Sequence, residues 1–214
     1  MPAGLESHDG FVRRAERALL RQPEPPRQPG DVILGDHRIA GFAPDMERIN
    51  NAVEAAVLVP VTFDEPGGRI ILTERSHKLR KHAGQVAFPG GRVDPGETAL
   101  ESALREAEEE INLDRSRVTP LGFLPNYYTG TGFRMTPVVA LVDRADDLVP
   151  NPEEVERVFT TPLSVLFNMD RYRLDSLVWE GRRRQFYVVD QPGAHIWGAT
   201  AALCRILFER LRDA

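Results

Sequence analysis

Three glutamates in the segment from Gly91 to Leu113 are spaced so that their carboxylates can act together. Glu106, Glu109 and Glu110 are three and four residues apart, so in a helix they project from the same side. Like charges at this spacing repel one another and weaken an isolated helix. A bound cation would remove that cost, and clustered carboxylate oxygens are the ligands that a hard divalent ion such as Mg²⁺ prefers. The alternative is an acidic helix face that lies in solvent.

The opposite side of this segment indicates a helix that is docked on a core. Its apolar residues recur at helical spacing: Leu100, Ala103, Leu104, Ala107 and Ile111. A Pro-Gly turn precedes Thr98, which can cap the start of the helix together with Glu101 three residues later. We therefore predict a helix over residues 98–111, with Glu101 and Glu108 in solvent.

The segment resembles the Nudix box, which is written G-x5-E-x7-R-E-U-x-E-E-x-G-U with U an aliphatic residue. The positions in register are Gly91, Glu97, Arg105, Glu106, Ala107, Glu109, Glu110 and Leu113. Asn112 stands where the pattern has its second glycine, just past the expected end of the helix. Asn is the usual second choice for a left-handed residue there, so we expect a costlier helix end and intact chemistry.

The resemblance implies an α/β fold, a Nudix-type α/β/α sandwich with a mixed β-sheet between helices. It also implies an enzyme that cleaves a nucleoside diphosphate linked to another group, with Mg²⁺ or Mn²⁺ as cofactor. The ligands that it implies are Glu106, Glu109 and Glu110, with Glu97 as an outer ligand and the carbonyl of Gly90 as a further one.

The same resemblance assigns roles to residues around the metal. Arg105 is expected to organise the site by pairing with Glu97 or a neighbour. The general base is either a box glutamate or an acid from a distant loop, for which Glu153 and Glu154 are the candidates. A solvated turn is an equally good interpretation of those two residues, although we include Glu154 among the catalytic candidates.

The residues that lead into the box narrow the substrate. The stretch from Ile71 to Gly91 is similar to the signature of the coenzyme A pyrophosphatase branch, roughly L-L-T-x-R-[SA]-x3-R-x3-G-x3-F-P-G-G. The matches are Ile71, Leu72, Thr73, Arg75, Ser76, Arg80, Gly84, Phe88, Pro89, Gly90 and Gly91. This resemblance implies hydrolysis of coenzyme A or acyl-coenzyme A to 3′,5′-ADP and 4′-phosphopantetheine or its acyl form.

Cations are concentrated in this upstream stretch, which suits a substrate rich in phosphate. The candidates for substrate binding are Arg75, Lys78, Arg80 and Lys81. Arginine can form two parallel hydrogen bonds to phosphate oxygens, and we expect Arg80 to bind the 3′-phosphate of coenzyme A. A basic surface loop is the alternative for each of them. Gly84 is expected to permit a turn, and Phe88 to lie in the core.

Aromatic side chains follow in a glycine-rich loop over residues 126–133. Tyr128 and Phe133 are candidates for stacking adenine or covering the pantetheine arm, and a plain loop between strands is equally compatible with the sequence. Trp197 opens a helical stretch and is expected to pack in the core.

Composition excludes several other classes. The chain has 214 residues, 42% of them hydrophobic and 28% charged, as in soluble globular proteins. A net charge of −5 provides no basic field for nucleic acid, and no apolar run has membrane-spanning length. The first twenty residues do not resemble a secretory signal, and the single Cys204 is expected in the core, so the cytoplasm is the default location.

Periodicity predicts a mixed order of helices and strands. Helices are expected over 11–21, 98–111 and 199–211, a helical turn over 162–168, and strands over 55–63, 69–73, 86–88, 118–124, 135–143 and 184–189. Residues 55–73 are expected to form a hairpin, and the proline-rich stretch 22–30 ends the first helix. We divide the chain into an N-terminal extension packed on the main domain (1–51), a Nudix domain (52–190) and a C-terminal helix that completes it (191–214).

Two other functions are compatible with these patterns. One is a Nudix pyrophosphatase that acts on ADP-ribose, NADH, a nucleotide sugar or a dinucleoside polyphosphate. The other is a non-catalytic module that senses a nucleotide, whose usual mark is the loss of box glutamates, and none is lost here. A homodimer is compatible with the sequence, which does not fix the oligomeric state.

Overall fold

Strand β2 (Val53–Thr62) is the centre of the fold because it pairs with three other strands. It runs parallel to β8 (Phe133–Val142) and antiparallel to β3 (Arg69–Arg75) and β5 (Gly90–Arg92). Its side chains alternate between two cores, with Val57 and Val59 on one side and Leu58 on the other. The computed structural model describes residues 4–25, 27–65, 67–179 and 181–214.

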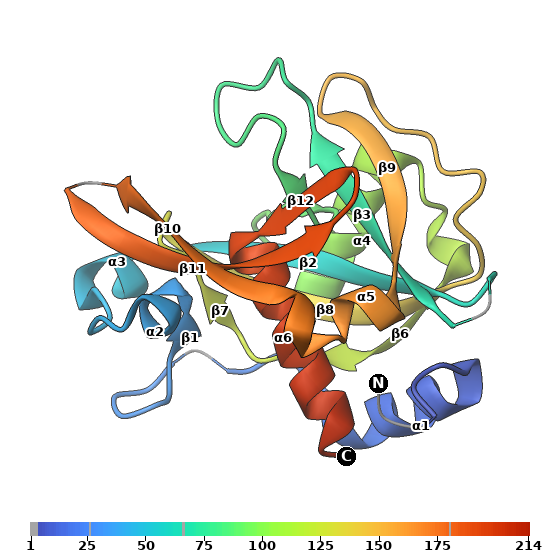
Figure 1. The fold of residues 1–214 in the computed structure, drawn as a ribbon, viewed down its shortest axis with the longest axis horizontal. Coiled ribbons are helices and arrows are strands. Elements are labelled where there is room, and N and C mark those ends of the chain that lie inside the picture. The colour runs from blue at the N-terminus through green and yellow to red at the C-terminus, as the bar shows by residue number, and fades with distance from the viewer. Residues whose placement is uncertain (1–3, 26, 66, 180) are drawn as a thin grey trace.

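The other strands extend this mixed sheet on both sides and form a second, smaller sheet (Figure 1). In the nine-stranded sheet they are β1 (Leu34–Gly35), β4 (Val86–Ala87), β6 (Val118–Phe123), β7 (Tyr127–Tyr128) and β9 (Val155–Pro162). The second sheet is antiparallel and contains β10 (Tyr172–Trp179), β11 (Arg182–Gln191) and β12 (Ala194–Trp197).

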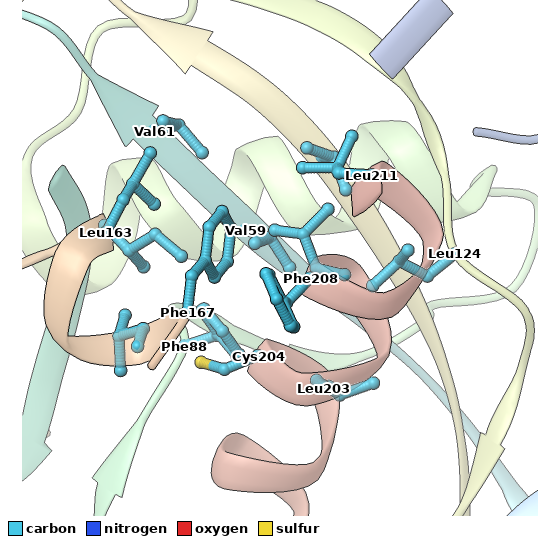
Figure 2. Close-up of a cluster of buried hydrophobic side chains, with 14 of the residues drawn as sticks. Val59, Val61, Phe88, Leu124, Leu163, Phe167, Leu203, Cys204, Phe208 and Leu211 are labelled. Carbon is cyan, nitrogen blue, oxygen red and sulfur yellow. The ribbon is translucent and has the colours of Figure 1, made fainter. Parts of the chain in front are cut away.

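Helices cover both faces of the large sheet, as the sequence predicts for the fold class. Helix α4 (Ala99–Ile111) buries its apolar side against β2 and β8, while α1 (His8–Ala18) and α6 (Gly198–Arg212) pack with the opposite core. Cys204 lies fully buried in that core, near Phe167 and Phe208, whose ring centroids are 5.4 Å apart (Figure 2). The mixed α/β fold class is therefore confirmed.

Shorter helical segments connect these elements. They are α2 (Asp36–Ala40), α3 (Met46–Asn50), α5 (Leu163–Leu166) and the 3₁₀ turns Arg115–Arg117 and Met169–Arg171. Helix α5 confirms the helical turn expected over 162–168. In the described part of the chain, no helix is both long and apolar enough to cross a membrane.

The first fifty residues are attached to the rest of the chain at several points. Helix α1 packs on α6, and Arg14 donates a hydrogen bond to the carbonyl of Leu211 over 2.9 Å. Further along, Leu20 forms an isolated antiparallel bridge with Phe123, and β1 runs parallel to β7. Residues from all three segments of our division thus share one core, and the division itself stays a prediction.

Several element boundaries differ from those expected. Helix α1 begins at His8, where the Ser7 side chain caps it, and ends at Ala18 rather than Arg21. Strands β9, β10 and β12 were not expected. The residues of β9 do not alternate between buried and exposed, so the sequence carries no period-two pattern that would predict a strand. The strand is recognised in the structure by its pairing with β3.

Both ends of α4 have the predicted caps. The Thr98 side chain accepts from the backbone N–H of Glu101, and the Glu101 carboxylate accepts from the N–H of Thr98. At the other end, Asn112 is left-handed with φ 54° and ψ 37°, as expected for the residue that replaces glycine.

We predict that Asn112→Gly raises the free energy of unfolding by about 0.5 kcal/mol, because glycine adopts this conformation without the clash of a Cβ. Asn112→Ala should lower it by about 1 kcal/mol. Denaturant unfolding of both variants measures the two changes. Asn51→Gly is the control, since Asn51 follows α3 with φ −102° and gains nothing from glycine. Equal stability of the two Asn112 variants would contradict the left-handed cap.

Candidate active site

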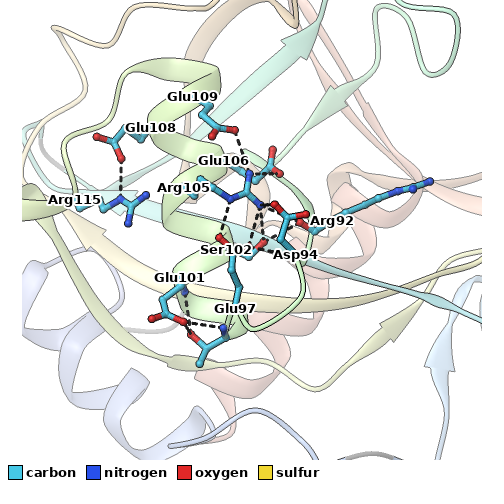
Figure 3. Close-up of polar contacts among 11 residues, drawn as sticks. Arg92, Asp94, Glu97, Glu101, Ser102, Arg105, Glu106, Glu108, Glu109 and Arg115 are labelled. Carbon is cyan, nitrogen blue, oxygen red and sulfur yellow. Dashed lines mark hydrogen bonds and ion pairs between the residues drawn. The ribbon is translucent and has the colours of Figure 1, made fainter.

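The Arg105 guanidinium lies at the centre of the acidic face of α4 (Figure 3). Its Nε donates to Glu97 Oε1 over 2.8 Å, and one terminal nitrogen donates to Glu106 over 2.9 Å and to Glu109 over 3.1 Å. The other terminal nitrogen donates to the carbonyl of Arg92 over 3.1 Å. The hydrogen bond from Arg105 lowers the pKa of Glu97. The structure thus pairs Arg105 with Glu97 and two neighbouring glutamates, and its organising role stays a prediction.

Glu110 is in a different environment from the other box glutamates. Its side chain is almost fully buried, accepts from the N–H of Gly90 over 3.1 Å, and lies 3.6 Å from a terminal nitrogen of Arg75. Burial raises the pKa of Glu110 to about 8, against the opposing effects of Gly90 and Arg75. Protein contacts alone therefore leave a negative charge at this position poorly compensated.

The Gly90-Gly91 turn lies directly against these carboxylates. A Cβ on Gly91 would lie 2.4 Å from the carboxylate carbon of Glu106. Gly90 has φ 154°, and a Cβ there would lie 2.4 Å from the carbonyl oxygen of Ala56. At Gly90 a Cβ would meet fixed backbone, so glycine is required there. At Gly91 a Cβ would displace the Glu106 carboxylate, so glycine leaves the space that this carboxylate occupies.

The donor set suits a hard divalent cation, although the carboxylates currently have other partners. As the side chains lie, no group of three His, Cys, Asp or Glu within the described residues is arranged to hold a metal ion. Glu106 and Glu109 are turned toward Arg105, and Glu110 toward the N–H of Gly90. Crowded carboxylate oxygens and the uncompensated burial of Glu110 are the features that such an ion would satisfy.

The two loop acids considered as general bases are placed differently. Glu154 is half-buried and close enough for its charge to contribute to the raised pKa of both Glu106 and Glu110. Its backbone carbonyl accepts from the N–H of Ser76 over 2.8 Å, which joins this loop to the end of β3. Glu153 is exposed, so the structure brings only Glu154 to the acidic cluster.

A cleft of about 380 Å³ begins at Arg75 and the Gly90-Gly91 turn and passes Phe133 and Trp197. It continues into a wider cleft of about 1070 Å³, because both are lined by Arg92, Phe133 and Trp197. Residues from the second sheet, including Phe186, line the wider part. A long substrate can therefore extend toward β11 from Arg75 and the Gly90-Gly91 turn, which adjoin Glu110 and Glu106.

The candidates for substrate binding fall into different surroundings. Arg75 and Phe133 line the narrow cleft and Lys81 the wider one, whereas Tyr128 is buried beside a small adjoining pocket. Lys78 and Arg80 are exposed and line none of these three cavities. Two left-handed residues, His82 and Gly84, lie in the same loop. The binding roles of all six stay predictions.

Sequence reasoning missed several residues of the cleft. Trp197, expected in the core, is partly exposed and packs on Phe186 with ring centroids 4.9 Å apart. Arg184 and Phe186 come from β11, whose position depends on the second sheet and has no local signal. Arg92 was identifiable in principle, because it directly follows the first glycine of the box.

Asp36 fixes the loop that forms one wall of this cleft. Its carboxylate accepts from the hydroxyl of Tyr127 over 2.7 Å and from the N–H of Gly130 over 2.6 Å. Arg48 donates to the carbonyl of Gly130 from the same N-terminal segment. Residues 34–48 therefore help to position Phe133, a contribution that the sequence did not reveal.

Comparison with solved structures supports the fold assignment. The Deinococcus radiodurans protein DR0079 is similar with a TM-score of 0.50 over 73% of this chain and 83% of its own. The two sequences are 17% identical, so this likeness concerns the fold alone.

Similarity to known sequences is much closer. The uncharacterized Nudix hydrolase NudL of Yersinia enterocolitica is 41% identical over 212 residues, which cover 95% of this chain and 98% of the relative. NudL of Pectobacterium atrosepticum is 38% identical over 171 residues, which cover 79% of this chain and 88% of the relative. The model of the NUDIX domain matches residues 53–180. On this evidence, together with the acidic helix and its glycine turn, the chain belongs to the Nudix hydrolase family.

Proposed function

We propose that the protein hydrolyses the diphosphate bond of coenzyme A and its derivatives, giving 3′,5′-ADP and 4′-phosphopantetheine. Nudix hydrolases act on small molecules and generally use divalent metal ions. The observation that carries the narrower assignment is the ungapped unit from Ile71 to Gly91. It supplies Arg75 beside Glu110 and the glycine turn beside Glu106, so the stretch that resembles the coenzyme A signature adjoins the acidic cluster.

The residues that would hold Mg²⁺ or Mn²⁺ are Glu106, Glu109 and Glu110. Glu97 would serve as an outer ligand, and the carbonyl of Gly90 would add an oxygen from the turn. Such an ion, when bound, offsets phosphate charge and lowers the pKa of a coordinated water. Arg105 limits the repulsion among these carboxylates and keeps Glu97 in place.

The remaining chemistry falls to residues around this cluster. Arg75 binds an oxygen of the diphosphate, and Glu154 accepts the proton of the attacking water. A bond forms between the water oxygen and one phosphorus, and the bridging P–O bond to that phosphorus breaks, so each half of the substrate leaves with one phosphate of the former diphosphate. Glu154 suits this role because it lies on a separate loop, close enough to affect the charges of Glu106 and Glu110, and the ion pairs of Arg105 within the described residues do not include it.

Coenzyme A should be the preferred substrate in a panel with ADP-ribose, NADH, a nucleotide sugar and diadenosine polyphosphates. The reaction should yield 3′,5′-ADP and require Mg²⁺ or Mn²⁺, with chelation by EDTA as the control. Chromatography of the products measures the preference. Intact coenzyme A beside efficient cleavage of another compound would reject the assignment and favour a different Nudix pyrophosphatase.

Glu110→Gln should lower kcat by a factor of about 10³ or more, because one metal ligand loses its charge. The amide can still accept from the N–H of Gly90, so thermal unfolding should show a folded protein. Titration with Mn²⁺ should show weaker binding. Normal turnover and normal Mn²⁺ affinity would contradict the metal assignment.

Glu154→Gln should lower kcat by a factor of about 10² or more, because the proton acceptor is lost. Mn²⁺ affinity should stay normal, because all the proposed metal ligands are kept. Glu156→Gln is the matched control, since Glu156 is exposed two residues further along. Kinetics at saturating Mn²⁺ compare the two variants. If Glu154→Gln retains full kcat, the base lies elsewhere, and a box glutamate becomes the first alternative.

A further inference from the structure

Arg92 occupies a central position in the cleft that leads away from the acidic face of α4. It lines both the narrow and the wide parts, and its guanidinium lies 5.9 Å from the centroid of the Phe133 ring. Its backbone carbonyl is held by Arg105 and by the hydroxyl of Ser102, so the strand beneath the side chain is fixed. The charged end is exposed and directed to cleft and solvent.

Two more cations line the wider part of the cleft. Lys81 comes from the upstream loop and Arg184 from β11. Within the described residues, neither Lys81 nor Arg92 forms an ion pair with an acidic side chain. Three acids, Asp36, Asp45 and Glu47, also line this cleft. The Asp36 carboxylate accepts from Tyr127 and Gly130, and Asp45 lies 3.9 Å from Arg48, so two of the three have partners of their own. An anionic group bound in this cleft would find, at Lys81 and Arg92, positive charge and hydrogen-bond donors that no acidic side chain of the described residues engages.

Aromatic side chains stand next to these cations. Phe186 and Trp197 pack on each other at an interplanar angle of 57°, and Phe133 lines the same space. Aromatic faces bind nucleobases by stacking, while arginine beside them binds phosphate. The combination of flat apolar surface and cations is what a nucleoside that carries a phosphate on its sugar requires.

We infer that this cleft binds the nucleoside half of the substrate and that Arg92 and Lys81 recognise the phosphate on its ribose. The inference rests on the proposed function, because the diphosphate must lie at Arg75 and the Gly90-Gly91 turn. It replaces Arg80, expected from the sequence to contact this phosphate, by cations that line the cleft. The base then lies against Phe133, Phe186 and Trp197.

The test compares coenzyme A with 3′-dephospho-coenzyme A in wild-type protein and four variants. Arg92→Gln and Lys81→Gln should each reduce kcat/KM for coenzyme A about tenfold, because KM rises. Neither should change kcat/KM for the dephospho compound appreciably. Arg17→Gln, an exposed arginine of α1, should leave both values unchanged. Arg80→Gln should leave the ratio of the two values unchanged.

Two results would overturn the inference. One is that both Arg92→Gln and Lys81→Gln keep the wild-type ratio of kcat/KM for coenzyme A to kcat/KM for the dephospho compound. The other is that Arg80→Gln, and neither of these two variants, lowers that ratio. If the wild-type protein leaves coenzyme A intact, the proposed function fails. Binding calorimetry then tests whether the cleft recognises a phosphate on the ribose. Adenosine 3′,5′-bisphosphate should then bind wild-type protein more tightly than 5′-AMP, and Arg92→Gln should remove the difference. Equal affinities in the wild type would reject the phosphate contact.

Discussion

The acidic face of α4 depends on a single guanidinium. Arg105 contacts Glu97, Glu106 and Glu109 and also the backbone of Arg92, so one side chain joins the helix, the turn before it and strand β5. Without that positive charge, carboxylates one turn apart would repel one another on a partly buried surface. The fixed guanidinium leaves Glu110, which faces the glycine turn, as the least compensated acid of the group.

Stability and chemistry make opposite demands at Glu110. A carboxylate that is 2% exposed costs free energy unless its charge is matched, and its raised pKa expresses that cost. Arg75 lies close but not in hydrogen-bond contact, and its buried Nε has no partner within the described residues. An apolar residue at position 110 would be buried at a lower cost in free energy. The buried Arg75–Glu110 pair therefore indicates selection for function over stability.

Local patterns predicted the parts of the site that lie close together along the chain. The caps of α4, its two faces and the glycine turn could be predicted because their physical causes act within a few residues. Phe186 and Trp197 could not be placed in this way, since they meet the site only after β10, β11 and β12 have paired. The contribution of Asp36 was equally invisible, because its two partners are more than ninety residues away.

The β1–β7 pairing and the packing of α1 on α6 have an evolutionary consequence. The recognisable family region, residues 53–180, excludes Leu5, Phe11 and Leu207, all fully buried in one core. A gene fusion that transferred only that region would expose the apolar surface that these residues cover. In this chain the unit of inheritance that recombination must preserve is therefore larger than the domain by which the family is recognised.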